Sequence, residues 1–292
     1  SISPAAPDAW ITALDRFGTM TFEQVVQPAL DLVENRVSLY PGQKDMAVTF
    51  RRLIEAERKA GGDRHAGLKA ARDLVYKGEI AREVADFFER EGGFLRMEDL
   101  AAFQARVEPA EQTSYRGYEV YSCGPWCQGP SLLMALNTLE GFDLQEMQHN
   151  SVDYLHAVLE ALKLTFSDRH AYFGDPDFVQ VPMQGLLSKD YAAERRAAID
   201  LQQASPDMPV PGDPWPYHPE PRSETGPVPK ATLAPEDQQY ALVWEDDTAY
   251  ACVVDEAGNA FSATPSDGVN SSPVIPELGF CLNSRAQMFW LE

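Results

Sequence analysis

The sequence of 292 residues carries 45 Asp and Glu against 24 Lys and Arg, which gives a formal net charge of −21 at pH 7. So negative a surface repels phosphate backbones and anionic lipid headgroups, which argues against nucleic acids and membrane surfaces as partners. Hydrophobic residues make up 44% of the chain, enough for a globular core in one or two domains. No apolar run approaches the ~18–20 residues of a membrane span. The opening SISPAAPDAW lacks the pattern of a signal peptide. Because the chain begins at Ser1 and not at Met, its compartment stays open.

Residues 10–107 are predicted to form a run of short helices. In residues 22–36, apolar side chains recur near one face, Thr21 is a plausible N-cap and Glu23 lies in the first turn. Further helices are expected at 68–76, 80–93 and 97–103, with Gly78 and the Gly92-Gly93 pair as stops.

A strand is predicted at 116–125, followed by helices at about 131–140 and 151–173. The long helix has an apolar series at steps of three and four residues, which predicts one buried face: Tyr154, Leu155, Val158, Leu159, Leu162 and Phe166. Glu160 and Lys163 can pair at i,i+3. The remaining polar side chains of this helix are interpreted as capping and interhelix contacts: His156, Asp168, Arg169 and His170.

Residues 206–235 hold 10 of the 22 prolines, so this segment is predicted to be a linker or extended tail. From Thr248, TAYACVVDEAGNAFSAT predicts a β-hairpin with its turn at Asp255–Asn259. A second strand pair is expected around Val274 and Phe280. A helical region, a proline-rich bridge and a β region in succession indicate an α+β protein.

The four cysteines are Cys123, Cys127, Cys252 and Cys281. The first two lie in CGPWC, whose three-residue gap differs from the two-residue gap of thioredoxin-like or zinc motifs. Isolated thiols are favoured over a disulfide or a metal site.

Several conventional catalytic motifs are absent from the sequence, including G-x-S-x-G, the P-loop, G-x-G-x-x-G after a strand and H-E-x-x-H. Thr248 stands where the proline-rich bridge meets the first strand of the hairpin, after Glu245-Asp246-Asp247. On general grounds a Thr in this place is a β-former or a cap.

Four long stretches change that interpretation, because they resemble the γ-glutamyltranspeptidases and their acylase-like relatives, a family of N-terminal-nucleophile hydrolases. The matching residues are 76–107, 115–143, 160–176 and 248–262. The resemblance to the acylase-like branch is the closer one. It implies part of a four-layer αββα sandwich.

The resemblance further implies self-cleavage of a precursor between Asp247 and Thr248. Residues 1–205 would then be the helical portion of the large subunit, 206–247 the bridge and 248–292 the start of the small subunit. Freed Thr248 would be the nucleophile through its hydroxyl and the base through its α-amine, whose reference pKa of about 7.7–8.0 suits neutral pH. Ser266, about 18 residues further on, would hydrogen-bond the nucleophile, where the family usually has Thr. The alternative for Ser266 is a turn serine.

The resemblance also places a substrate pocket after Ser266. Gly268 stands where the transpeptidases have a substrate-binding Asn, with Asp267 and Asn270 close by. In LNSRAQMF, which includes Asn283, Arg285 and Met288 replace the family's Gln and Asp. Loss of the acid removes the partner of a substrate ammonium, and Arg285 adds a bidentate carboxylate ligand. A carboxylate-bearing acyl group without the α-amine is therefore expected. The alternative is a surface arginine that forms an ordinary salt bridge.

The expected activity is that of an amide hydrolase or acyltransferase acting through an acyl-enzyme ester on small-molecule amides, including γ-glutamyl-type ones. No motif calls for a metal or an organic cofactor. The family's N-terminal segment and its later Gly-Gly pair lie outside this sequence, so it is interpreted as an internal portion of a precursor that processes into two subunits. The missing flanking segments would be its partners, and alone it would be a weak catalyst. The alternative is an uncleaved family member that acts as a scaffold or binding module.

Overall fold

The computed structural model describes the chain except for residues 1, 36–42, 224–247, 267–271 and 285–292. The chain divides into two compact units, one formed by residues 1–106 with 241–292 and one by 107–240. The described residues contain both helices and strands, which confirms the prediction of an α+β protein.

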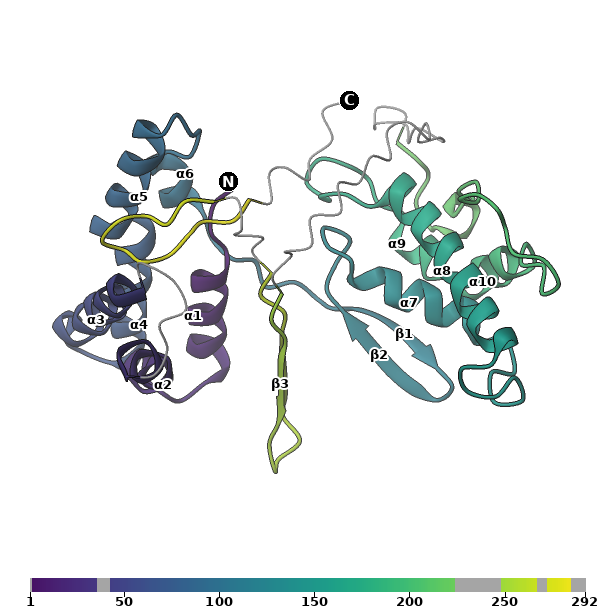
Figure 1. Cartoon of the computed structure of the whole chain (residues 1–292), viewed down its shortest axis with the longest axis horizontal. Coiled ribbons are helices and arrows are strands. Elements are labelled where there is room, and N and C mark those ends of the chain that lie inside the picture. Colours follow the sequence, from purple (N-terminus) through teal and green to yellow (C-terminus); the bar gives the residue numbers. More distant parts are fainter. Residues whose placement is uncertain (1, 36–42, 224–247, 267–271, 285–292) are drawn as a thin grey trace. The chain divides into compact units, whose positions relative to one another are not determined.

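Helices dominate the first unit (Figure 1). Two apolar clusters hold them together, a larger one that includes residues of α4, α5 and α6 and a smaller one between α2 and α3. Its elements are α1 (Ala6–Phe17), α2 (Phe22–Asn35), α3 (Gln43–Ala60), α4 (Arg64–Tyr76), α5 (Glu79–Arg90), α6 (Met97–Ala102), β3 (Ala251–Val254) and β4 (Ala260–Ala263). The hydroxyl oxygen of Thr21 accepts a hydrogen bond from the backbone N–H of Gln24, and the side-chain oxygen of Gln24 accepts one from the backbone N–H of Thr21, so the predicted cap of α2 is a capping box. Helix α4 begins four residues earlier than predicted, because Asp63 accepts from the N–H of Ala66 and caps it there.

A segment distant in sequence completes the core of the first unit. Ile275, Leu278 and Leu282 are buried against α4, α5 and α6. The hydroxyl of Thr49 on α3 donates to the carbonyl of Leu278 at 2.8 Å. The second strand pair predicted here is only an isolated bridge between Val274 and Cys281. These side chains therefore attach the chain after the β3–β4 hairpin to the helices.

The second unit contains a hairpin and a helical cluster. Its elements are β1 (Glu111–Tyr115), β2 (Tyr118–Ser122), α7 (Gly129–Leu139), α8 (Val152–Tyr172), α9 (Met183–Leu186), α10 (Lys189–Arg196) and a 3-10 helix (Trp215–Tyr217). The predicted strand at 116–125 shortens to β2, because Arg116 and Gly117 both take positive φ and turn the chain back from β1. Its core joins α7, α9 and α10 through Met134, Met183, Leu186 and Tyr191.

The buried face of α8 is not the predicted one. Leu155 and Leu159 are exposed at 45% and 56%, whereas Glu160, Ser167 and Asp168 are buried. The Glu160–Lys163 pair forms as predicted, at 2.7 Å. The apolar periodicity therefore indicated the wrong face, because the face that makes the tertiary contacts, here called the polar face, combines Glu160, Ser167 and Asp168 with small and apolar side chains.

The polar face of α8 binds the start of the proline-rich segment. Lys163 and Ser167 donate to the carbonyls of Ser205 and Pro209, and Tyr172 donates to that of Gly212 at 2.7 Å. Prolines supply no N–H to a strand or helix, but their carbonyls remain free to accept. The segment predicted to be a linker is thus hydrogen-bonded to α8 over its first residues. Residues 224–247 lie outside the described part of the chain.

Candidate active site

Thr248 and Ser266 lie together at the open end of the β3–β4 hairpin. Strand residues Ala251 and Ala263 are paired, and the N–H of Ala249 donates to the carbonyl of Pro265 at 3.0 Å. Continued by one residue, this antiparallel register sets Thr248 opposite Ser266. Their hydroxyl oxygens are 2.8 Å apart, within hydrogen-bond distance. A separation of 18 residues thus becomes a direct cross-strand contact.

The turn of the hairpin holds that register. Gly258 has φ of 83°, a conformation that side-chain-bearing residues rarely adopt. Asp255 accepts from both the backbone and the side chain of Asn259, at 2.8 and 2.7 Å. These hydrogen bonds from Asn259 lower the pKa of Asp255. The turn predicted at Asp255–Asn259 is therefore confirmed, and it centres the hairpin midway between Thr248 and Ser266.

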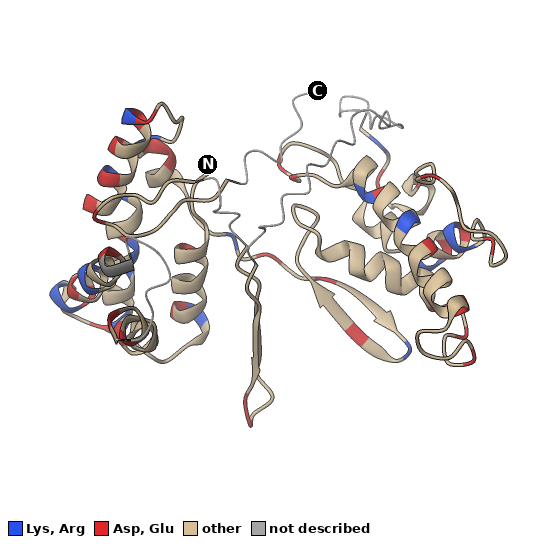
Figure 2. Ribbon diagram, in the orientation of Figure 1, with Lys and Arg blue, Asp and Glu red and all other residues tan. Residues whose placement is uncertain are grey.

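The hairpin carries no charged residue along either strand and is acidic at its tip (Figure 2). Val253, Val254 and Phe261 are between 48% and 69% exposed. Among the described residues, β3 and β4 pair only with each other. Residues 248–266 contain no Lys or Arg, so the hairpin itself offers no cation to an anionic ligand.

Of the other predicted site residues, the structure describes only Asn283, which contacts the start of the chain. Asn283 is 8% exposed, and its side chain donates to the carbonyl of Ile2 at 3.1 Å and accepts from the N–H of Ile2 at 3.4 Å. Asn283 therefore links the segment after the hairpin to the start of the chain by two hydrogen bonds. Asp247, Asp267, Asn270 and Arg285 lie outside the described residues.

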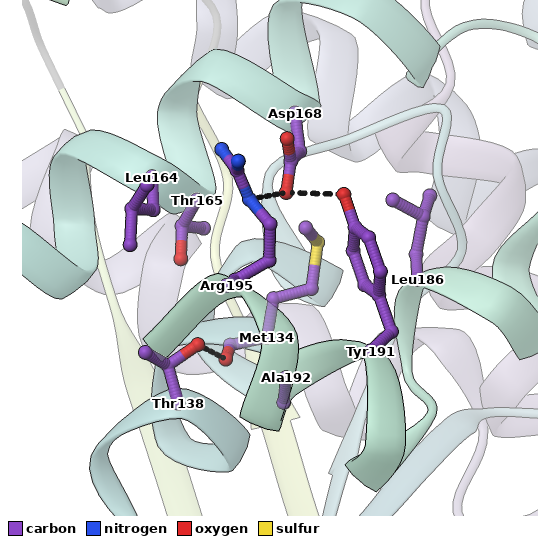
Figure 3. A pocket seen from close by; sticks show the side chains of 9 residues that line it. All are labelled: Met134, Thr138, Leu164, Thr165, Asp168, Leu186, Tyr191, Ala192 and Arg195. Carbon is purple, nitrogen blue, oxygen red and sulfur yellow. Dashed lines mark hydrogen bonds and ion pairs between the residues drawn. The ribbon is translucent and has the colours of Figure 1, made fainter. Parts of the chain in front are cut away.

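The second unit has a small pocket between α7, α8, α9 and α10 (Figure 3). Asp168 accepts from the hydroxyl of Tyr191 at 2.9 Å, from Nε of Arg195 at 3.1 Å and from the N–H of Gly212 at 2.8 Å. The cavity, about 10 Å³, is at the lower limit for a single water molecule. Asp168 thus makes the interhelix contact predicted for it, and the pocket has no room for a substrate.

Neither a metal cluster nor a membrane span is found in the part of the chain that the structure describes. No group of three or more His, Cys, Asp or Glu there is arranged to hold a metal ion. No helix there combines the length and the apolar character needed to cross a bilayer.

Comparisons with known proteins bear on the whole chain. A family model described as gamma-glutamyltranspeptidase matches residues 41–292. The glutathione hydrolase proenzyme of Escherichia coli is 29% identical over 98% of this chain and 50% of its own length. The acylase ACY 1 proenzyme of a Pseudomonas species is 35% identical over 69% of this chain and 40% of its own length.

The fold is similar to that of a solved member of the same group. The cephalosporin acylase from Bacillus halodurans superposes with a TM-score of 0.67 at 25% identity, covering 98% of this chain and 52% of that one. The chain thus spans about half the length of the relatives it matches along its whole extent.

Proposed function

The chain belongs to the γ-glutamyltranspeptidase family, and from this premise we propose that it acts as an amide hydrolase or acyltransferase whose nucleophile is the hydroxyl of Thr248. The observation that carries the proposal is the 2.8 Å contact between the hydroxyls of Thr248 and Ser266. A hydroxyl is a weak nucleophile unless a base removes its proton and a neighbour orients it. Ser266 orients it, and the base is the α-amine that Thr248 gains when the bond to Asp247 is cut.

Self-cleavage is required because a peptide nitrogen cannot act as that base. Its lone pair is delocalised into the carbonyl. In the proposed maturation the hydroxyl of Thr248 attacks the carbonyl carbon of Asp247, the C–N bond breaks, the hydroxyl proton passes to the departing nitrogen, and an ester joins the two residues. Water then hydrolyses the ester and leaves a carboxylate on Asp247 and a free α-amine on Thr248. Residues 206–247 would form the bridge between the large-subunit portion 1–205 and the small-subunit portion that starts at Thr248.

The same atoms would then process substrate. The α-amine of Thr248 takes the hydroxyl proton as the oxygen attacks an amide carbonyl, and it returns that proton to the departing amine. The acyl group stays on Thr248 as an ester until water or an acceptor amine removes it. The names of the relatives, glutathione hydrolase and acylase, support amide cleavage as the reaction.

Two features support a processed heterodimer within a larger sandwich. Ile275, Leu278 and Leu282 are buried among helices of the first unit, which would hold the piece starting at Thr248 after the backbone is cut. A two-stranded hairpin is marginally stable alone in water, and the exposed apolar side chains of β3 and β4 suit a strand covered on both faces. We therefore propose the four-layer αββα arrangement for the whole protein.

The acyl group is proposed to carry a carboxylate. Arg285 is the only Lys or Arg in residues 248–292, so any cationic side chain that this segment brings to an anionic acyl group must be Arg285. Asp267, Asn270 and Asn283 are proposed as its polar neighbours. Asn283 would have to release the backbone of Ile2 before it could reach a substrate.

The test is to follow cleavage and hydrolysis in the whole protein carrying Thr248→Ala. We expect wild type to give two masses split at Thr248 under denaturing conditions and one complex under native conditions. Thr248→Ala should remain one chain without activity, Thr248→Ser should cleave, and Ser266→Ala should slow both reactions while Ser266→Thr retains them. Ser262→Ala is the matched control, because it removes a hydroxyl from the same hairpin.

Two outcomes would contradict the proposal. Two fragments and undiminished hydrolysis in Thr248→Ala would exclude Thr248 as the nucleophile. A single intact mass for wild type would favour an uncleaved scaffold.

A further inference from the structure

The loop between β2 and α7 brings two thiols into contact. Cys123 directly follows β2, and Cys127 lies two residues before α7. Their sulfurs are 2.8 Å apart, and both cysteines are free. A disulfide bond measures about 2.05 Å, so less than an ångström of movement separates this contact from a covalent bond. The sequence favoured isolated thiols, whereas in the structure Cys123 and Cys127 form a contacting pair.

The backbone around the pair is held by its own hydrogen bonds. The N–H and the thiol of Cys127 both contact the carbonyl of Gly124, at 3.2 and 3.4 Å, and the N–H of Gly129 donates to the sulfur of Cys127 at 3.4 Å. Trp126, at the crest of the loop, donates to the carboxylate of Glu108 at 2.9 Å. Because folding already brings the sulfurs together, closing a disulfide here costs little further chain entropy.

The ends of the loop approach each other closely. A Cβ on Gly129 would lie 1.8 Å from the hydroxyl oxygen of Ser122 and 3.1 and 3.2 Å from backbone atoms of Cys123, so a side chain here would make Ser122 turn away and crowd the backbone of Cys123. This close approach fixes the start of α7 beside the end of β2, and it thereby sets the distance between the two cysteines.

We propose that Cys123 and Cys127 form a redox-active dithiol whose oxidants are low-molecular-weight disulfides. The Cys123 thiol loses its proton, its thiolate attacks one sulfur of the small disulfide, whose S–S bond breaks, and the first small thiol leaves after taking up that proton. The sulfur of Cys127 then attacks the sulfur of Cys123, and the second small thiol leaves with the proton of Cys127. Two protein thiols lose two electrons and two protons, and one small disulfide becomes two thiols.

The surroundings of the two sulfurs assign their order of reaction. Cys123 is exposed and Cys127 is partly buried, so the incoming disulfide reaches Cys123 first. Burial also raises the pKa of the Cys127 thiol to about 12, which keeps it protonated near neutral pH. Cys123 is therefore the attacking thiol and Cys127 the resolving thiol.

The test uses the whole chain with Cys252→Ser and Cys281→Ser, so that only the pair can react. The protein is equilibrated with set ratios of oxidised to reduced glutathione, and N-ethylmaleimide is added to block the free thiols. Intact mass spectrometry then measures the mass of each product. A synthetic peptide of residues 121–129 serves as the unfolded reference, because it has the same loop without the fold.

We expect the protein to form the disulfide, so that it changes from carrying two maleimides to carrying none and holds no glutathione. This change should occur at a glutathione ratio at least about tenfold more reducing than the ratio at which the peptide is oxidised. Cys127→Ser should stop at a glutathione adduct on Cys123, and Cys123→Ser should react several-fold more slowly than Cys127→Ser. A protein that still carries two maleimides, and is therefore still reduced, at ratios that oxidise the peptide would overturn the proposal. So would a stable glutathione adduct that never converts to the disulfide while Cys127 is present.

Discussion

Arg285 is the only Lys or Arg in residues 248–292. It lies 37 residues after the proposed nucleophile. If it binds the distal carboxylate of the acyl group, that carboxylate distinguishes one substrate from another. Hydrogen bonds between charged groups contribute about 1.5–3 kcal/mol, equivalent to roughly 10- to 150-fold in affinity. Arg285 is thus the residue at which the acyl preference can be tested.

Arg285→Leu in the whole protein should lower kcat/KM for a glutaryl amide by about 10- to 100-fold and leave a butyryl amide nearly unchanged, because only the first has a carboxylate to lose. Arg285→Lys should recover part of the loss, since it restores charge without bidentate geometry. The measurement is a panel of glutaryl, butyryl and γ-glutamyl amides. Preference for γ-glutamyl donors, together with an unchanged glutaryl rate in Arg285→Leu, would show that the arginine makes an ordinary surface contact.

The hairpin is the element that converts sequence spacing into site geometry. Its turn pairs Asp255 with Asn259, and every later pair up to Thr248 and Ser266 follows from that register. A change of register by one residue would turn one hydroxyl to the opposite face. Stability of the turn should therefore control how often the two hydroxyls meet.

Gly258→Val places a β-branched residue at φ of 83°, which should cost about 1–3 kcal/mol. Because an isolated hairpin is marginally stable, we expect the rate of self-cleavage to fall by about 5- to 150-fold. The rate is measured by denaturing gel electrophoresis of freshly made protein. Ala257→Val is the matched control in the same turn and should have a small effect. Equal rates for both variants would show that the turn does not limit cleavage.

At the scale of the whole molecule, each compact unit contains a buried carboxylate–arginine pair between segments distant in sequence. Asp8 on α1 binds Arg72 on α4 and the N–H of Ala105. Asp168 on α8 binds Arg195 on α10 and the N–H of Gly212. Removing one partner of such a pair leaves an uncompensated buried charge, at a cost of about 3–5 kcal/mol.

Asp8→Asn should therefore destabilise the first unit by about 3 kcal/mol and alter its response to acid. Burial raises the pKa of Asp8, but hydrogen bonds from Arg72 and Ala105 outweigh it and hold the pKa below its usual range. The stabilisation from Asp8 is thus complete above the unfolded-state pKa of about 3.9 and is lost as pH falls through the folded-state value. Hydrogen exchange resolved by peptide between pH 3 and 6 measures this.

Asp168→Asn is the matched variant, and its loss of protection should appear in peptides of residues 107–223. If hydrogen-exchange protection of residues 6–106 fell with pH in the same way in Asp8→Asn and in wild type, the role of Asp8 would be contradicted.

Local sequence patterns predicted much of the secondary structure. Thr21 capped α2 and Asp255–Asn259 formed the hairpin turn, because caps and turns depend on contacts within a few residues. β1 and α10 were not anticipated. The buried face of α8 was predicted wrongly, since its partners Ser205, Pro209 and Gly212 lie about 40 residues away in sequence.

The sequence by itself determined the family, the α+β class and the candidate pair Thr248 and Ser266, because long matching stretches keep their order and spacing. Only the tertiary structure decided that this spacing is a cross-strand contact of 2.8 Å, that Asn283 binds the backbone of Ile2, and that Cys123 and Cys127 touch. The first contact depends on the register of the hairpin strands. The second depends on a segment 281 residues away in sequence, and the third on the loop between β2 and α7. Packing and backbone hydrogen bonding across the fold set those positions, and composition or local propensity carries no record of them.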